Sequence, residues 1–580
     1  MAQRTLIKNG TVYDGTGAPP VAADVLIENG KVAAISAHGQ IKAAGAKKID
    51  AKGMWVTPGF LDTHTHYDAE LAISPGLTES VKHGVTSVVV GSCSVSFVSS
   101  APEDCSDMFT RVEAVPREIV LPILKKIKKW DSPRGYRQWI DKHPLGPNVA
   151  SFMGHSDLRA RAMGLERSVT SERPAPTEQK FMEAQLNEAL DCGFLGMSCM
   201  TNPWDRLDGD RAWSKPLPSY FAKRGEKKPL LEILRRRHRI HQSAPNLITR
   251  VNVLGMALAG AGIFRQPLRT TLITMMDLKA DSYVLALTRF VAWLANSVFR
   301  GNFRWQSPPV PFDLYYDGWD SVLFEEFHAG QKIRDAAKDL GKRHALLEDK
   351  AFRARFKKDL LRKLAPKVWH RDLADTVILA CPDKAAVGKS FARVAEERGQ
   401  EAIDVFLDML LKYDRDIRWF TCLANHRPEK LAEIMQSEAT LMSFADSGAH
   451  LRNMAFYNFP LRMLKNVRDA ELAGKPIMPV EKAVWRLTGE LAGWFGLDAG
   501  VLKPGKVADI AVIDPTLLND TIEKKKLQPW EKGFKFERLV NEGAAVRHVF
   551  IAGQEALKNG KVTPALGKKR MGRFLESTFN

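Results

Sequence analysis

Residues 1–58 alternate short β-like runs with turn signals, in TLIKNGTVYDG, ADVLIENGKVAAIS and AKKIDAKGMWVTPG. Asn9-Gly10 and Asn29-Gly30 separate such runs, and Asn-Gly favours the tight turn of a β-hairpin. The same texture returns near the C-terminus, in VLKPGKVADIAVIDP and VRHVFIAGQEALKNGKV. We therefore expect a small β-domain made from both ends of the chain, with 491–580 supplying its second part and a C-terminal tail.

Residues 59–490 alternate apolar, strand-like runs with helical stretches. The runs lie at 86–92, 148–155, 193–198, 246–253, 269–276 and 439–446. Repeated βα alternation predicts a parallel sheet, either closed into a barrel or open. The segment from about 222 to 300 lacks clean alternation, and we interpret it as an insertion or an elaborated βα unit.

The charge of the chain raises the question of a nucleic-acid partner. The 580 residues are 45% hydrophobic and 26% charged, as in ordinary globular enzymes, but the formal net charge is +18. Lys and Arg cluster at 223–240, 353–367 and 568–573. These clusters contain no nucleic-acid-binding motif and lie in helical, largely Glu-containing stretches, so we predict a solvated surface and no nucleic-acid partner.

The most apolar stretch, 283–299, is short for a membrane span and carries Arg289 in its middle. We predict a buried or amphipathic helix and no transmembrane segment, with peripheral membrane contact left open. The N-terminus lacks the features of a signal peptide, so a cytoplasmic location is expected. The six cysteines form no CxxC pair and do not indicate a disulfide framework.

A histidine pair, His64 and His66, follows an apolar run in GMWVTPGFLDTHTHYDAE. Two residues separated by one position on a strand point to the same face. Both imidazoles could then bind one divalent ion. The alternative is a solvent-facing pair on an exposed strand, which the apolar run and the flanking Asp62 and Asp68 make less favourable.

Two further strand ends carry residues with metal chemistry. Cys93 comes just after Val88-Val89-Val90, and a thiolate is a good ligand for zinc. Asp446 ends the apolar run of LMSFADSGAHL, where a carboxylate beside a metal-bound water can act as a general base. The alternatives are inert packing for Cys93 and a turn-forming role for Asp446.

Two more segments are candidates for substrate contacts. In MGHSDLRARAMG, His155 and Arg159 follow an apolar strand, and an arginine can bind a substrate carboxylate with two hydrogen bonds. In TLITMMDLKAD, Asp277 and Lys279 end another run and must pair or bind something if buried. An internally satisfied polar loop is the alternative for both segments.

Taken in order, these pieces resemble the amidohydrolase superfamily, specifically its N-acyl-D-amino-acid deacylase (D-aminoacylase) branch. The resemblance rests on TVYDGTGAP, PGFLDTHTHYD, GVTSVVVGSCSVS, MGHSDLR, SFADSGAH and AVWRLTGELAGWFGLDAGVLKPGKVADIAVIDP, spread over nearly the whole chain. It implies an α/β fold: a (β/α)8 TIM-like barrel with a small β-sandwich domain formed from both termini. It also implies one or two zinc ions at the C-terminal ends of the strands.

The resemblance assigns roles to individual residues. His64 and His66 would be metal ligands, and Cys93 would replace the bridging carboxylated lysine of other members. Asp446 would be both a ligand and the general base. His155 and Arg159 match the GHxxLR segment that lines the site in the family.

The chain departs from the family at its fifth and sixth strands. The deacylases usually carry a THxR and an SHxK segment there, and the corresponding stretches here are ITRVN (248–252) and MMDLK (275–279). The first histidine is missing, Asp277 takes the place of the second, and Lys279 is kept. We therefore expect Asp277 to be an additional metal ligand.

The sequence thus predicts a zinc-dependent hydrolase that cleaves the amide bond of an N-acyl amino acid or a related small molecule. Arg159 or Lys279 would hold the substrate carboxylate, and His155 would stabilise the tetrahedral oxyanion. The alternatives are a hydrolase of cyclic amides or peptide-like acyl compounds, and a non-catalytic barrel that serves as a binding module. A homo-oligomer is plausible because sandwich edges and apolar segments would otherwise be exposed.

Overall fold

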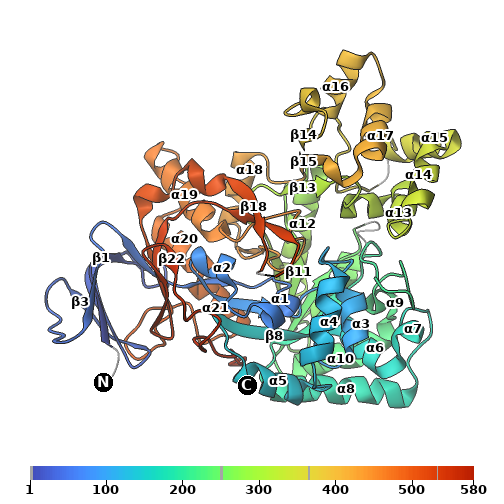
Figure 1. Ribbon diagram of the computed structural model, residues 1–580. Helices are drawn as coiled ribbons and strands as arrows, with labels where there is room; N and C mark the ends of the chain where they lie inside the picture. The colour runs from blue at the N-terminus through green and yellow to red at the C-terminus, as the bar shows by residue number, and fades with distance from the viewer. Residues whose placement is uncertain (1–3, 248–251, 363–365, 532, 580) are drawn as a thin grey trace.

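The structure is a computed structural model that describes residues 4–247, 252–362, 366–531 and 533–579 (Figure 1). Its centre is an eight-stranded sheet with the order β16-β12-β11-β10-β9-β8-β7-β6. All neighbouring strands in this sheet are parallel. The strands are β6 (Phe60–Asp62), β7 (Val85–Val90), β8 (Asn148–Gly154), β9 (Gly196–Met200), β10 (Ile240–Ala244), β11 (Arg269–Ile273), β12 (Asn302–Gln306) and β16 (Thr440–Leu441).

The two edges of this sheet meet, because the chain beyond β16 runs beside the chain beyond β6. Thr65 and Ser447 form a parallel bridge, and the His66 amide donates to the Ser447 carbonyl at 2.8 Å. The Asp446 amide donates to the His64 carbonyl at 3.1 Å. The predicted TIM-like barrel is therefore confirmed, and its closure brings Asp446 against the histidine pair.

Helices cover the outside of the barrel, as expected when parallel strands are buried on both faces. In β7 all six residues of VTSVVV are buried. Helix α8 shows the complementary pattern, burying Met182, Leu186 and Leu190 at helical spacing. The helices before the seventh strand are α1 (Asp68–Ile73), α2 (Thr78–Lys82), α3 (Pro102–Phe109), α4 (Arg117–Ile127), α5 (Pro133–Lys142), α6 (His155–Met163), α7 (Leu165–Ser168), α8 (Pro176–Asp191), α9 (Pro218–Phe221), α10 (Arg224–Arg236), α11 (Asn252–Gly260) and α12 (Tyr283–Trp293). Those around and after the eighth strand are α18 (Pro428–Gln436), α19 (Phe459–Leu472), α20 (Val480–Leu487) and α21 (Gly489–Phe495).

Both ends of the chain build one nine-stranded sheet, as predicted. Strand β17 from the C-terminal part pairs antiparallel with β5 from the N-terminal part, which joins the two halves. The strands are β1 (Arg4–Val12), β2 (Val21–Glu28), β3 (Lys31–Ala37), β4 (Lys47–Asp50), β5 (Trp55–Pro58), β17 (Ile510–Ile513), β20 (Val546–Ile551), β21 (Gln554–Lys558) and β22 (Lys561–Val562). A separate two-stranded ribbon, β18 (Lys525–Pro529) and β19 (Glu537–Asn541), follows β17.

The two Asn-Gly signals of this sheet have different outcomes. Asn29-Gly30 links β2 to β3 with positive φ at both residues (52° and 77°), as a tight hairpin turn requires. Asn9-Gly10, also predicted as a hairpin turn, lies inside β1 at a register shift. Its bulge is held by the Asp24 carboxylate, which accepts from the Asn9 amide at 2.9 Å.

The segment that interrupts the βα alternation lies between β12 and β16. It forms an antiparallel sheet of β13 (Asp313–Asp317), β15 (Arg418–Cys422) and β14 (Val377–Ala380), in that order. Helices α13 (His328–Asp335), α14 (Leu340–Glu348), α15 (Lys350–Leu360), α16 (Phe391–Arg398) and α17 (Ala402–Tyr413) belong to the same region. Figure 1 shows it projecting away from the rest of the molecule, and fully buried Trp319, Trp369 and Trp419 fill its core.

The segment 222–300, which we interpreted as an insertion or an elaborated βα unit, carries the barrel strands β10 and β11 and their helices. The hydrophobic pattern did not reveal the fifth strand, because β10 has the polar sequence IHQSA and is nevertheless buried throughout. The predicted strand 246–253 is wrong where it can be judged, since Asn252 begins α11; residues 248–251 lie outside the described residues.

Helices α11 and α12 expose large apolar side chains, among them Leu258, Tyr283, Phe290 and Trp293. Nevertheless, no helix within the described ranges combines the length and the hydropathy needed to cross a membrane. The peripheral membrane contact suggested for 283–299 stays a prediction.

Candidate metal centre

The two histidines of the HTH triplet lie at the C-terminal mouth of the barrel, just after β6. His64 is fully buried and His66 nearly so. Nδ1 of His64 lies 2.6 Å from Oε1 of Gln306, the last residue of β12. Because an amide oxygen only accepts hydrogen bonds, this contact places the proton on Nδ1 and leaves Nε2 unprotonated for a metal ion.

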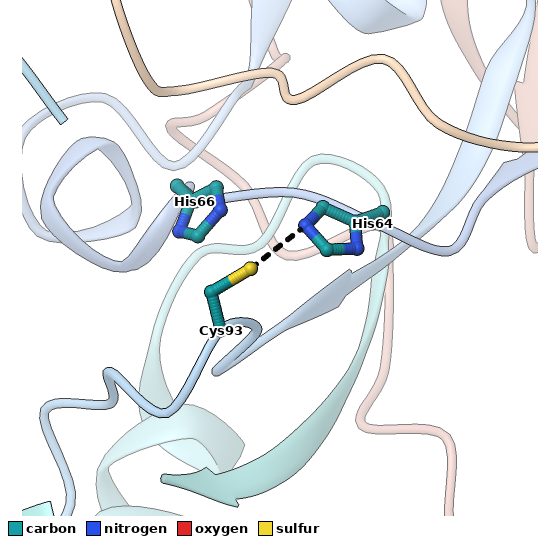
Figure 2. A group of neighbouring side chains, drawn as sticks. All are labelled: His64, His66 and Cys93. Atoms are coloured by element: carbon teal, nitrogen blue, oxygen red, sulfur yellow. Dashed lines mark hydrogen bonds between the residues drawn. The ribbon is translucent and has the colours of Figure 1, made fainter. Parts of the chain in front are cut away.

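Cys93 joins the pair from the loop after β7. Its Sγ lies 3.4 Å from Nε2 of His64, and ligand atoms of Cys93, His64 and His66 all lie within 4.8 Å of one another (Figure 2). The Cys93 amide donates to Oε1 of Gln242, on β10, at 3.0 Å. Burial raises the pKa of the thiol to about 12, so the thiolate needs a cation to form there.

Asp446 faces both histidines from the loop after β16. Its Oδ1 lies 3.2 Å from Nε2 of His66 and 3.7 Å from Nε2 of His64. Burial raises the pKa of this carboxyl, but the hydrogen bond from His66 and the charges of both histidines outweigh it and lower the pKa to about 2. The carboxylate is therefore ionised and aimed at the same point as the imidazoles.

The backbone at Asp446 approaches the histidines very closely. Gly448 has a φ of 89°, and a Cβ on it would lie 2.6 Å from the His66 carbonyl oxygen. Asp446 has a φ of 54° and Cys93 a φ of 51°, values that cost strain energy in residues other than glycine. Strained residues of this kind gather at functional sites, where the surrounding structure holds them in place.

Glu113 is a buried carboxylate of the site that the sequence analysis did not identify. Its Oε1 lies 3.1 Å from Nδ1 of His66, and its carbonyl accepts from the His450 amide at 2.5 Å. Burial raises the pKa of Glu113 to about 8. A carboxylate behind a metal-binding histidine fixes the orientation of the ring. No motif surrounds Glu113 in TRVEAV, so nothing local in the sequence marks it.

Asp277 does not join this group, contrary to our expectation that it is a metal ligand. Its carboxylate is fully buried and bound by Arg427, with Nε of Arg427 2.8 Å from Oδ2 and Nη2 in contact with Oδ1. Lys279 does not face the centre either, since its ammonium pairs with Asp375 of the segment between β12 and β16. Asp277 and Lys279 are thus each engaged in an ion pair with a residue that lies far away in the sequence.

His155 and Arg159 lie on α6, outside the barrel. Nδ1 of His155 contacts the Ser219 hydroxyl at 3.1 Å, and its Nε2 lies 3.3 Å from Oε1 of Glu226. Arg159 pairs with Glu226 and donates to the Ser168 and Glu172 carbonyls at 2.9 and 2.8 Å. These contacts match the internally satisfied polar loop that the sequence left open, and they do not support the predicted roles in oxyanion and carboxylate binding.

The fifth and sixth strands supply no histidine to the centre. The fifth strand is β10 and not the stretch 248–252 used in the sequence analysis. Neighbouring residues of a strand point to opposite faces, so His241 points away from Gln242, towards the helix layer. There burial and the charges of Lys227 and His155 lower the pKa of His241 to about 3. Ala244 and Ile273 end β10 and β11 and pack in the same cluster as Cys93. Within the described ranges, His64, His66 and Cys93 form the one group with metal-binding spacing.

A cavity of about 190 Å³ opens beside Asp446 and His450, and Arg111 is part of its wall. Nη2 of Arg111 pairs with Glu325 at 2.8 Å and Asp335 at 3.2 Å. Its buried Nε and Nη1 have no hydrogen-bond partner in the part of the chain that the structure describes. Arg111 therefore lines this cavity, whereas Arg159 and Lys279 do not.

The donor set fits zinc. Two imidazoles, a thiolate and a carboxylate are its usual protein ligands, and their convergence from three strand ends leaves the barrel mouth for a substrate. One set of this kind is present among the described residues.

Comparisons with known proteins place these features in context. No family model matches the chain. An uncharacterized protein of Mycobacterium tuberculosis is 44% identical over 564 residues, which is 96% of this chain and 92% of the relative. The chain also superposes on a zinc- and phosphonate-bound N-acyl-D-glutamate deacylase from Bordetella bronchiseptica (TM-score 0.63, 22% identity) and on a D-aminoacylase described as binuclear, with one-metal activation and second-metal attenuation (TM-score 0.62, 20% identity). Each superposition covers 99% of both chains.

Proposed function

We propose that this chain, which superposes on a D-aminoacylase and an N-acyl-D-glutamate deacylase, is a member of the amidohydrolase superfamily and a zinc-dependent hydrolase of N-acyl amino acids. The observation that carries the proposal is the convergence of His64, His66 and Cys93 within 4.8 Å, with Asp446 facing the same point. The non-catalytic alternative would not require Cys93 and Asp446 to be held in strained backbone conformations around one position.

In this proposal, His64, His66, Cys93 and Asp446 hold one zinc ion. When bound, zinc would polarise the scissile carbonyl and lower the pKa of a water ligand towards neutrality. Gln306 keeps Nε2 of His64 unprotonated, and the Glu113 carboxylate lies 3.1 Å from Nδ1 of His66 as its ion-pair partner. These partners explain why the imidazoles point inward before any ion arrives.

Asp446 acts as the general base and then as the general acid. Its ionised carboxylate accepts a proton from the water that attacks the acyl carbon. As the C–N bond breaks, Asp446 returns that proton to the leaving nitrogen, so the products are a carboxylic acid and a free amine. Asp446 can serve in both steps because it faces the same point as both histidines.

Arg111 takes the role of carboxylate binder that the sequence analysis gave to Arg159 or Lys279. Arg111 is part of the wall of the cavity beside Asp446. A guanidinium donates charge-assisted hydrogen bonds to a carboxylate, and such bonds are strong. The substrate in this proposal therefore carries a carboxylate on the amine side of the scissile amide.

The test is hydrolysis by zinc-reconstituted protein of a panel of N-acyl amino acids of both chiralities, with release of free amine as the readout. We expect activity that is lost on chelation, restored by zinc, and abolished in His64→Ala. Lys279→Ala serves as the matched control, because its side chain pairs with Asp375 away from the centre. A protein that binds zinc stoichiometrically but releases no amine from any member of the panel would contradict the proposal.

A further inference from the structure

A second cavity, of about 310 Å³, lies at the C-terminal ends of β10 and β11 and beneath α11 and α12. Its wall is almost entirely apolar. The apolar side chains of the lining include Val253, Leu254, Ile273, Met276, Val291 and Trp305.

Three polar side chains of this wall are bonded to the protein. The Thr274 hydroxyl donates to the Gln306 carbonyl at 2.8 Å, and the Thr288 hydroxyl donates to the Leu285 carbonyl at 2.9 Å. The Trp305 indole donates to the Thr288 carbonyl at 2.9 Å. No Asp, Glu, Lys or Arg belongs to the described part of the lining. The described lining therefore favours an apolar ligand group, because a polar one would lose its hydrogen bonds to water.

The apolar cavity adjoins the cavity beside the metal centre. Two residues line both cavities: Leu247, just after β10, and Val368, from the segment between β12 and β16. Ile273 lines the apolar cavity and also packs in the same cluster as Cys93. A molecule whose amide lies at the centre can therefore extend past Leu247 and Val368 into the apolar cavity, while its carboxylate reaches Arg111.

We propose that the apolar cavity binds the acyl chain of the substrate, and that the protein acts on N-acyl amino acids whose acyl chain is much longer than acetyl. This inference rests on the proposed function, to which it adds the substrate class. Each methylene moved from water into such a cavity improves binding by roughly three- to fourfold.

The experiment compares acetyl, butanoyl, octanoyl and dodecanoyl derivatives of one amino acid with the zinc-loaded protein. We expect kcat/KM to rise by roughly three- to fourfold per methylene until the cavity is full. In parallel, cis-parinaric acid, a fluorescent fatty acid, serves as a probe that binds without being hydrolysed.

Leu254→Trp is the informative variant, because Leu254, itself 40% exposed, lines the cavity from α11, and a larger side chain there would reduce the space for a ligand. We expect this variant to lose the preference for long chains and the binding of the probe, while acetyl hydrolysis stays unchanged. Leu258→Trp is the matched control, one turn further along the same helix, exposed and outside the lining.

The outcomes separate this inference from the proposed function. Equal rates for acetyl and dodecanoyl substrates, or probe binding that Leu254→Trp does not weaken, would overturn the inference and leave the hydrolase intact. Specific probe binding without hydrolysis of any N-acyl amino acid would overturn the proposed function and support an acyl-chain site.

Discussion

The two sides of the barrel mouth differ sharply. On the side of β6, β7 and β16, buried polar groups converge: His64, His66, Cys93 and Asp446. On the side of β10 and β11, the strands end in Ala244 and Ile273, next to an apolar cavity. One scaffold thus presents a metal-binding half and an apolar half across the same opening.

The backbone follows the same division. Cys93, Ser94, Asp446 and His450 all have positive φ on the metal-binding side. Residues 244–247 and 274–279, at the ends of β10 and β11, have none. Left-handed backbone conformations therefore accompany the residues that aim ligand atoms, and none occurs at these ends of β10 and β11.

The largest effect is expected from the histidines of the metal-binding half. His66→Ala removes an imidazole that faces Asp446 at 3.2 Å, so it should lower kcat/KM by roughly 10³-fold or more and abolish stoichiometric zinc. Zinc analysis and amine release measure both effects.

His241→Gln is the matched histidine of the other half. His241 faces the helix layer and not the centre, so this variant should keep its zinc. Loss of zinc in His241→Gln, at wild-type folding by circular dichroism, would contradict the division between the halves.

Glu113→Gln tests whether the metal-binding half depends on the carboxylate behind His66. Because such a partner raises the basicity of the ligand and fixes its ring, we expect zinc affinity or activity to fall by roughly 10- to 100-fold. Competition with a chelator measures the affinity. An unchanged zinc affinity and an unchanged pH profile would show that Glu113 is only a packing residue.

Arg111→Met tests the carboxylate binder in the cavity beside Asp446. Removing charge-assisted hydrogen bonds of about 1.5–3 kcal/mol should raise KM by roughly 10- to 100-fold. The change should affect N-acyl amino acids but not the corresponding N-acyl amino amides, which carry no carboxylate. Equal losses for acids and amides would assign Arg111 to structure alone.

The smallest effect on catalysis is expected from Asp277→Asn, on the apolar side. The carboxylate is buried against Arg427, so its loss should lower Tm while kcat/KM stays within about twofold of wild type. Thermal unfolding and steady-state kinetics measure the two quantities. A loss of zinc in this variant would restore Asp277 as a ligand.

The centre was largely predictable because its chemistry lies at the ends of apolar strands. The HTH triplet, Cys93 after a valine-rich strand and Asp446 after LMSFA each combine a ligand with a local strand signal. The order of parallel strands then brings these ends to one mouth. The barrel and the domain from both termini follow from the same alternation of patterns.

The remaining features depend on long-range contacts that local patterns do not contain. Asp277 resembles a ligand until Arg427, 150 positions away, is found to bind it. Strand β10 was missed because its polar residues are buried, and this shifted the alignment of the fifth strand. Glu113 and Arg111 lie just after α3, without a strand or motif to mark them, and only the fold brings them to the site.

The most direct test of the central claim is the position of zinc in crystals of the metal-loaded protein, located by anomalous diffraction at the zinc edge. We predict one ion with Nε2 of His64, Nε2 of His66, Sγ of Cys93 and the Asp446 carboxylate at about 2.0–2.3 Å. An ion bound elsewhere, at Asp277 or His241 for example, or crystals that take up no zinc at this position, would contradict it.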